Sequence, residues 1–327
     1  MWKIGDIQID GRVALAPMAG VTSVGYRDFM IPFGVSVAYT EMVSDMGLIY
    51  GNEETLSYLP NKKEAVPIGI QLFGHEPKDI ANAAIICEKK CKFFDFFDIN
   101  MGCPVPKVTK AGSGSALMLD PVKCGEIVRA IKKVSSKPVT AKIRLGYEND
   151  SHNFFEVIKE LENAGVDAIA IHPRTRTEYY AGKAHYGEVV NLREKMTVPL
   201  IISGDIFTLN DALRALEITK ADAVMVARGG MGNPILVTQI NEFLKNKTEI
   251  LASSLSEKMD YAIQLADLLI EEKGELNAMR IYRGIVTTFF NGIPNCKPLK
   301  KRLGMELIDR NSLISIFADF KREHNID

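Results

Sequence analysis

The sequence predicts a (β/α)8 TIM barrel followed by a small all-helical C-terminal domain. Eight short apolar segments rich in β-branched residues recur before Pro234. Amphipathic patterns, with apolar residues three and four positions apart, separate several of these segments. Polar residues stand at the C-terminal end of nearly every apolar segment. In a barrel these ends meet on one face, where such folds carry out their chemistry.

The predicted strands are apolar along nearly their whole length, as is typical of parallel sheets covered by helices on both faces. An open, doubly wound sheet is the alternative architecture. Eight strands can close into a barrel, and the clustering of polar strand ends favours closure. The predicted strands are residues 12–17, 35–41, 67–73, 96–100, 138–144, 166–172, 199–205 and 221–228.

Helical patterns lie between the later strands and beyond the last one. Asp120 and Thr208 precede two of these helices as N-caps, and Gly165 ends another. The helices predicted between strands are residues 121–134, 153–165 and 208–219. Those predicted after the barrel are residues 257–272, 276–290 and 312–322. We therefore predict a catalytic barrel domain at residues 1–240 and a helical domain at residues 241–327.

The composition predicts a globular protein without a membrane segment. Of 327 residues, 46% are hydrophobic and 25% charged, so a large core can form. The apolar runs are shorter than the ~20 residues that span a bilayer, and no signal-peptide pattern opens the chain, so we expect a cytoplasmic protein. The five cysteines lack CxxC spacing, which predicts reduced thiols and no metal site. At a net charge of −1, contact with nucleic acid requires a local basic patch.

The densest group of candidate functional residues follows the fourth strand. Asn100 and Cys103 belong to an Asn-Met-Gly-Cys-Pro turn, and two prolines with two later glycines predict a long loop, or lid, over the barrel mouth. Lys107 and Lys110 give this loop two positive charges. A lone cysteine is often only a small buried apolar residue. The Gly-Cys-Pro turn at the catalytic rim instead favours a chemical role for Cys103.

Two glycine-rich turns follow the seventh and eighth strands, where barrels commonly bind phosphate through backbone N–H groups. The first is Ser203-Gly204-Asp205, and the second runs from Ala227 and Arg228 to Pro234. Arg228 adds a permanent positive charge. The alternative is that these glycines only permit tight turns. A phosphate site is favoured because both turns are rich in glycine.

Three polar residues interrupt otherwise apolar strands. Burying a charge is costly unless it is paired, so we expect Lys142 to point into the barrel mouth, together with Gln71 and His172. Lys142 could act as a Schiff-base amine or as a cation that neutralises an anionic cofactor. A lone barrel histidine is often structural, but Arg174 and Arg176 lie on the same rim as His172.

Taken together, these motifs resemble the tRNA-dihydrouridine synthase family, and specifically its bacterial, B-type members. They occur in family order from about Leu15 to Pro234, and DINMGCP and HPRTR together are highly specific. The matching segments are APMAGVT (16–22), QLFG (71–74), DINMGCP (98–104), AKIRLG (141–146), HPRTR (172–176), GD (204–205) and GNP (232–234).

The resemblance implies an FMN-binding barrel that reduces uridine in tRNA with NADPH or NADH as the reductant. It assigns Cys103 as the proton donor. It places Asn100, Arg174 and Lys107 on the substrate side. The cofactor side comprises Pro17, Met18, Ala19, Gln71, Lys142, His172, Ser203, Gly204, Asp205, Ala227 and Arg228. Ser203 and Ala227 depart from the Asn and Gly that the family usually has there, and both are small enough to keep the backbone contacts.

Reduction of the uracil C5=C6 bond requires a hydride at C6 and a proton at C5. No side chain donates hydride, so a cofactor must supply it. Cys103 serves as the acid only while it remains a thiol, which is the reverse of a nucleophilic cysteine. Lys142 and His172 are expected to hold the reduced, anionic cofactor.

A uridine within folded RNA must leave its stack to enter a barrel mouth, at a cost of a few kcal/mol. Phosphate contacts elsewhere must offset this cost. Between residues 276 and 305 the sequence has six basic residues and no acidic one, which favours RNA contact over an ordinary solvated surface. These residues are Arg280, Arg283, Lys297, Lys300, Lys301 and Arg302.

Three alternatives remain for the function. Another FMN barrel enzyme acting on a small molecule would share the rim residues but would have no use for the basic helical domain. A sugar-phosphate lyase or isomerase would use Lys142 covalently and bind no flavin. A non-catalytic RNA-binding protein would not need a complete set of site residues. The sequence fixes neither the uridine position in tRNA, nor NADPH over NADH, nor the oligomeric state.

Overall fold

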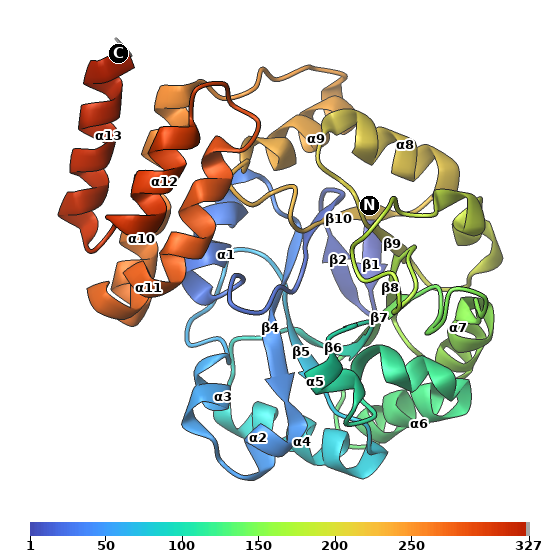
Figure 1. Cartoon of the computed structure of the whole chain (residues 1–327). Coiled ribbons are helices and arrows are strands. Elements are labelled where there is room, and N and C mark those ends of the chain that lie inside the picture. Colours follow the sequence, from blue (N-terminus) through green and yellow to red (C-terminus); the bar gives the residue numbers. More distant parts are fainter. Residues whose placement is uncertain (325–327) are drawn as a thin grey trace.

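The computed structural model describes residues 1–324, so the last three residues of the predicted helical domain lie outside the described residues. Eight parallel strands close into a barrel in the order β10-β3-β4-β5-β6-β7-β8-β9, which confirms the predicted fold class (Figure 1). The barrel strands are β3 (Val13–Leu15), β4 (Val37–Ser44), β5 (Ile68–Phe73), β6 (Phe96–Met101), β7 (Val139–Arg144), β8 (Ala168–His172), β9 (Leu200–Ser203) and β10 (Ala223–Val226).

An N-terminal hairpin that the sequence analysis did not predict closes one end of the barrel. Strands β1 (Trp2–Ile4) and β2 (Ile7–Ile9) pair antiparallel. Ile4 and Ile9 are fully buried in the same apolar cluster as inward residues of the barrel strands. Gly5 at the hairpin turn has φ +56° and lies against Pro138, which precedes β7. The hairpin therefore covers the N-terminal ends of the strands and leaves their C-terminal ends free.

Helices surround the barrel, and their ends follow the predicted capping signals. The Asp120 side chain accepts a hydrogen bond from the Lys123 N–H, and Thr208 forms a reciprocal capping box with Asp211. The longer barrel helices are α1 (Val24–Met30), α4 (Pro77–Lys90), α6 (Pro121–Lys132), α7 (Phe154–Asn163), α8 (Leu209–Thr219) and α9 (Ile235–Asn246). Shorter ones near the mouth are α2 (Asp45–Ile49), α3 (Glu53–Ser57) and α5 (Pro106–Thr109).

Four helices follow the barrel and pack against one side of it (Figure 1). Glu272 accepts hydrogen bonds from the Ser23 hydroxyl and the Gly25 N–H, which joins α10 to α1. These C-terminal helices are α10 (Leu255–Lys273), α11 (Glu275–Val286), α12 (Lys297–Met305) and α13 (Arg310–His324). The predicted division at residues 240 and 241 stays a prediction, and α9 runs through it. Within residues 1–324, no helix is long and apolar enough to cross a membrane.

Candidate active site

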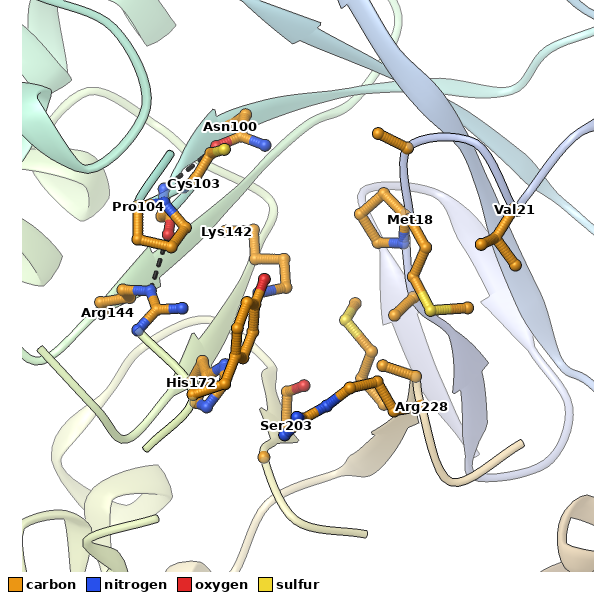
Figure 2. Close-up of a pocket in the computed structure, with 18 of the residues that line it drawn as sticks. Met18, Val21, Asn100, Cys103, Pro104, Lys142, Arg144, His172, Ser203 and Arg228 are labelled. Atoms are coloured by element: carbon orange, nitrogen blue, oxygen red, sulfur yellow. Dashed lines mark hydrogen bonds between the residues drawn. The ribbon is translucent and has the colours of Figure 1, made fainter. Parts of the chain in front are cut away.

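A cavity of about 360 Å³ opens at the C-terminal ends of the barrel strands. Cys103 and Arg144 form one side, Met18 and Val21 the facing side, and His172, Ser203 and Arg228 lie between them (Figure 2). This volume is within the usual range for small-molecule sites. The strand ends thus place most of the predicted residues around a single cleft, whereas Lys107 and Arg174 are not part of its lining.

The Cys103 turn is held by hydrogen bonds on both sides. Asn100 Oδ1 accepts from the backbone N–H groups of Cys103 at 2.9 Å and Gly102 at 3.2 Å. The Cys103 carbonyl accepts from the Ser115 N–H at 3.1 Å and from the Ser115 hydroxyl at 2.9 Å. A Cβ on Gly114 would lie 2.8 Å from this carbonyl oxygen. The turn is therefore fixed before any ligand binds.

The environment of Cys103 keeps it a thiol. Burial raises its pKa, and this effect outweighs the opposing pull of the Val105 N–H, Arg144 and Lys142. The positive charges of the cleft therefore do not suffice to ionise Cys103. Its side chain is only partly buried, whereas the other four cysteines are buried. Cys103 is thus suited to donate a proton into the cleft.

The loop predicted to cover the mouth folds into α5 and a 3-10 helix at Gly114–Leu119. Lys107 and Lys110 are exposed on it, so they present two positive charges to solvent rather than to the cleft. Pro104 and Val105 line the cavity beside Cys103. The predicted lid thus contributes Pro104 and Val105 to the cleft wall, while its two lysines lie on the outer surface.

Asn100 and Gln71 line the cleft, but their amides are already engaged. Asn100 Nδ2 donates to Gln71 Oε1 at 2.8 Å and contacts Met42 Sδ at 2.9 Å. Gln71, which is fully buried, donates from Nε2 to Asp98 Oδ2 at 2.6 Å. The Asn100 side chain therefore lines the cleft and at the same time holds the Cys103 turn.

Lys142 extends from β7 toward the cleft centre (Figure 2). Burial and the neighbouring Arg144 lower its pKa to about 8, against the opposing effect of Asp98 and Cys103. No hydrogen bond or ion pair joins its ammonium group to any residue of 1–324. At neutral pH Lys142 is thus mainly a half-buried cation that lines the cleft without a protein partner, ready for an anionic or electron-rich ligand.

Arg144 and Tyr180 are the most polar of the cleft residues that the sequence analysis did not assign to the site. Arg144, two positions after Lys142 on the same strand face, donates to the carbonyls of Gly102 at 2.7 Å and Tyr179 at 2.8 Å. Its spacing from Lys142 could have revealed it. Tyr180 lines the cavity with a half-exposed ring, 4.7 Å from the Arg228 guanidinium carbon. Its position depends on the fold of the loop after β8, which left no periodic signal.

His172 is neutral, and this changes the role expected for it. Burial, followed by the surrounding cations, lowers its pKa well below the usual value. Its Nε2 lies 3.1 Å from Arg174 Nη1, which can only donate, so the ring proton is assigned to Nδ1. His172 can thus offer a hydrogen bond to a ligand, while the positive charge comes from Lys142.

Arg174 lies behind the cleft wall rather than facing it. It is 1% exposed and forms a paired hydrogen bond with Asp205, with Nη1–Oδ1 at 3.0 Å and Nη2–Oδ2 at 2.8 Å. Its other N–H groups reach His172 and the carbonyls of Ala181 and Gly182. All five donors are therefore used within the protein, so a direct contact with substrate requires one of these hydrogen bonds to open, and the substrate role of Arg174 stays a prediction.

The turns after β9 and β10 form a backbone cradle. No group within residues 1–324 accepts a hydrogen bond from the backbone N–H of Gly204, Asp205, Arg228 or Gly229. A Cβ on Gly229 would lie 1.8 Å from the Ile206 carbonyl oxygen, so only glycine lets the two turns meet. Unpaired N–H groups beside an arginine are what a phosphate group requires.

The remaining predicted residues complete this end of the cleft. Pro17, Met18 and Ala19 line the wall after β3, and Ser203 and Ala227 line the floor beside the cradle. The Asp205 carboxylate accepts from Arg174 and from the Ala184 N–H, and these contacts outweigh burial and lower its pKa. Asp205 therefore offers its N–H, not its carboxylate, to a ligand. Residues 1–324 contain no cluster of acidic, histidine or cysteine side chains that could hold a metal.

The basic C-terminal segment is less uniformly positive than its sequence suggests. Arg302 pairs with Glu306 at 2.9 Å and with Asp319 of α13 at 3.0 Å, so acidic residues outside the segment neutralise it. Arg283 donates to the Leu307 carbonyl and Lys300 to Asn291. The residues left exposed and unpaired within the described chain, here called the basic face, are Arg280, Lys297 and Lys301.

The fold and the cleft define a (β/α)8-barrel enzyme with a half-buried thiol at one end of its cleft and an anion cradle at the other. The chain belongs to the dihydrouridine synthase family, because the model described as "Dihydrouridine synthase (Dus)" matches residues 14–322. The resemblance found in the motifs is thus confirmed, as is the prediction of an enzyme.

Relatives agree with this membership. The chain is 34% identical over 296 residues to a "Probable tRNA-dihydrouridine synthase" of Rickettsia bellii, covering 90% of each chain. It is also 34% identical to "tRNA-dihydrouridine synthase B" of Pasteurella multocida, covering 90% of this chain and 88% of that one. These relatives support the B-type resemblance.

The fold is shared with more distant solved structures. Histamine dehydrogenase from Rhizobium sp. 4-9 superimposes with a TM-score of 0.55 at 14% identity, covering 83% of this chain and 50% of that one. A variant of NCR from Zymomonas mobilis gives a TM-score of 0.51 at 14% identity, covering 78% and 93%. At this identity the likeness concerns the barrel fold alone.

Proposed function

We propose that this chain is an FMN-dependent tRNA-dihydrouridine synthase that reduces specific uridines with NADPH or NADH. The observation that carries the proposal is the pairing of a protonated Cys103 with an unpaired lysine and a backbone anion cradle in one cleft. The family membership and the names of the relatives support it.

The residues present fit FMN. Four unpaired backbone N–H groups and the half-exposed Arg228 suit its phosphate. Lys142 suits the electron-rich side of the ring, and Pro17 to Ala19 offer an apolar wall. Arg174 supports Asp205 and His172 at this end of the cleft.

The chain's own residues account for the proton. When bound and reduced, FMN supplies the hydride for uracil C6. Cys103 Sγ gives its proton to C5, so the uracil gains two hydrogens and the thiolate is later reprotonated from solvent. Arg144, held against the Gly102 carbonyl, places a positive charge beside the new thiolate. Overall, uridine, NAD(P)H and a proton give dihydrouridine and NAD(P)⁺.

The cleft can admit one base but not a helix, so the uridine must be turned out of its stack. The Tyr180 ring, exposed at the mouth, is available to stack on that base. Asn100 lies near the base, but its amide oxygen accepts the hydrogen bond that holds the Cys103 turn. We assign tRNA contact outside the cleft to the basic face and to Lys107 on the lid. A substrate of this kind fits the expected cytoplasmic location.

A direct test begins with the purified protein. We expect the visible absorbance of oxidised flavin, its loss on adding NADPH or NADH, and its return on adding tRNA that lacks dihydrouridine. Mass spectrometry of the tRNA should show uridine that has gained two hydrogens. A colourless protein that is trapped covalently on Lys142 by borohydride and a carbonyl substrate would instead identify the lyase or isomerase alternative.

A further inference from the structure

Asp98 is a buried acid to which neither the resemblance nor the proposed function gives a role. It lies on β6, two residues before Asn100, and is 1% exposed. Its Oδ2 accepts from Gln71 Nε2 and its Oδ1 from the Thr140 hydroxyl, both at 2.6 Å. Within residues 1–324 it forms no ion pair. Lys142 acts on it only through space, and burying a carboxylate that no cation contacts directly is costly, so a specific role is expected for it.

Asp98 is the inner end of a continuous chain of hydrogen bonds. Gln71 Oε1 accepts from Asn100 Nδ2 at 2.8 Å. Asn100 Oδ1 in turn accepts from the backbone N–H of Cys103 at 2.9 Å, a bond drawn in Figure 2. The carboxylate is thereby joined to the backbone of the proposed proton donor through two amides.

The donors and acceptors of this chain of hydrogen bonds can be arranged in only one way. An ionised carboxylate only accepts hydrogen bonds, and a backbone N–H only donates, whereas each amide has one donor end and one acceptor end. Two amides that link a carboxylate to a backbone N–H must therefore each point the NH2 group toward the carboxylate and the oxygen toward the N–H. If Gln71 turned over, its oxygen would face the carboxylate and its NH2 group would face that of Asn100. Asp98 therefore sets the orientation of Gln71 and of Asn100, and Asn100 holds the turn.

We propose that Asp98 is a positioning residue which, through Gln71 and Asn100, locks the Cys103 turn and keeps the thiol partly buried at the cleft. The importance of this for turnover rests on the proposed function, in which Cys103 gives the proton. The lock itself is a property of the protein alone, and can be measured without flavin chemistry.

Four variants separate the parts of this proposal. Asp98→Leu removes the acceptor, and Gln71→Met breaks the chain at its middle if the leucine variant does not fold. Asp98→Asn keeps an acceptor for Gln71 while its NH2 group faces Thr140, whose hydroxyl can turn to the Phe97 carbonyl at 3.4 Å. Thr140→Val is the matched control, because it removes a hydrogen bond from the same carboxylate on the side away from Cys103.

The measurement is the rate at which iodoacetamide alkylates Cys103 in the folded protein, followed by peptide mass spectrometry. The other four cysteines are buried, so native labelling reports this thiol. A released turn exposes the thiol and lowers its pKa, so we expect roughly three- to tenfold faster alkylation in Asp98→Leu and Gln71→Met. Asp98→Asn and Thr140→Val should stay within about twofold of the unaltered protein.

Two results would overturn the proposal. An unchanged alkylation rate in both Asp98→Leu and Gln71→Met would mean that the hydrogen bonds from Asp98 to Cys103 do not hold the turn. Equal acceleration in Asp98→Asn and Asp98→Leu would mean that the charge of Asp98, and not its acceptor, acts on Cys103. Neither result depends on tRNA or FMN, so both are distinct from a failure of the proposed function.

Turnover gives a second readout that a general loss of folding would not reproduce. Asp98 is buried behind the cleft lining and Gln71 is buried within that lining, so neither reaches the outer surface of the protein. Asp98→Leu should therefore lower kcat by about tenfold or more while KM for tRNA changes little. Asp98→Asn should restore most of kcat. A KM that rises with unchanged kcat would contradict positioning of the proton donor.

Discussion

The two ends of the cleft differ in how far their polar groups are satisfied. At the Cys103 turn, Asn100, Ser115 and Arg144 engage the backbone on every side. At the turns after β9 and β10, four N–H groups have no acceptor within residues 1–324. These four residues line the open cleft, where an anion can accept hydrogen bonds from their N–H groups, so the unpaired set is suited to a ligand. A paired set marks a place where geometry is fixed in advance.

The difference suggests a division of labour within the cleft. The satisfied end positions the acid and gains nothing from a ligand, whereas the unsatisfied end gains hydrogen bonds only when an anion arrives. Variants at the first end should therefore alter chemistry without altering cofactor binding. Variants at the second should alter cofactor binding first.

The largest effect is expected at the satisfied end. Cys103→Ala removes the proton donor but no contact of the cradle, so turnover should fall by about 10²- to 10⁴-fold while FMN stays bound. The measurement is dihydrouridine formed under single turnover, with the flavin spectrum as the control. Undiminished turnover would remove Cys103 from the chemistry.

The next effect concerns the cradle. Gly229→Ala places a Cβ against the Ile206 carbonyl oxygen and forces the two turns apart, so FMN affinity should fall by roughly tenfold or more. Titration of the FMN-free protein by fluorescence measures this. Gly187→Ala is the matched control, since nothing lies within 4 Å of its Cβ position. Equal FMN affinity in both variants would show that the cradle does not bind the phosphate.

A smaller effect separates stability from function at Asp98. Burial raises its pKa from 3.8 to about 6, so between these values the folded state binds more protons than the unfolded state. Stability contributed by this group is therefore highest below pH 4 and falls as pH rises to 6, by up to about 3 kcal/mol.

Asp98→Asn mimics the neutral form and should raise the free energy of unfolding at pH 7, with the gain disappearing near pH 4. Urea unfolding at several pH values measures it, and Thr140→Val provides the comparison. A loss of stability at pH 7 in Asp98→Asn would mean that the ionised carboxylate stabilises the fold, contrary to the effect of burial.

Much of this arrangement could be predicted from the sequence. Strand periodicity and polar strand ends are local signals, and in a closed barrel they converge by geometry. Thus Cys103, Lys142, His172 and the two glycine-rich turns were expected at the mouth, and the structure places them there.

What could not be predicted depends on tertiary contacts. The N-terminal hairpin is too short for a periodic signal, and its burial follows from the space within the barrel. Arg174 and Asp205 are distant in sequence, so no local pattern indicated that their side chains would form hydrogen bonds with each other. In the same way, Glu306 and Asp319 lie outside the basic segment and neutralise Arg302 only after folding.

The smallest effect is expected on the surface of the helical domain, where a paired and an unpaired basic side chain can be compared. Lys301 is exposed and unpaired within the described chain, whereas its neighbour Arg302 is held by two acids. If the basic face binds tRNA phosphates, Lys301→Ala should weaken tRNA binding by about 1 kcal/mol and reduce the salt dependence of log K by about one.

Arg302→Ala should leave tRNA affinity nearly unchanged and slightly destabilise the helical domain, because its charge is already used within the protein. Fluorescence anisotropy with labelled tRNA at several salt concentrations measures the first effect, and thermal unfolding the second. Equal losses of affinity in both variants would show that the Arg302 ion pairs open on RNA. In that case the distinction between satisfied and unsatisfied groups would hold in the cleft but not on the surface.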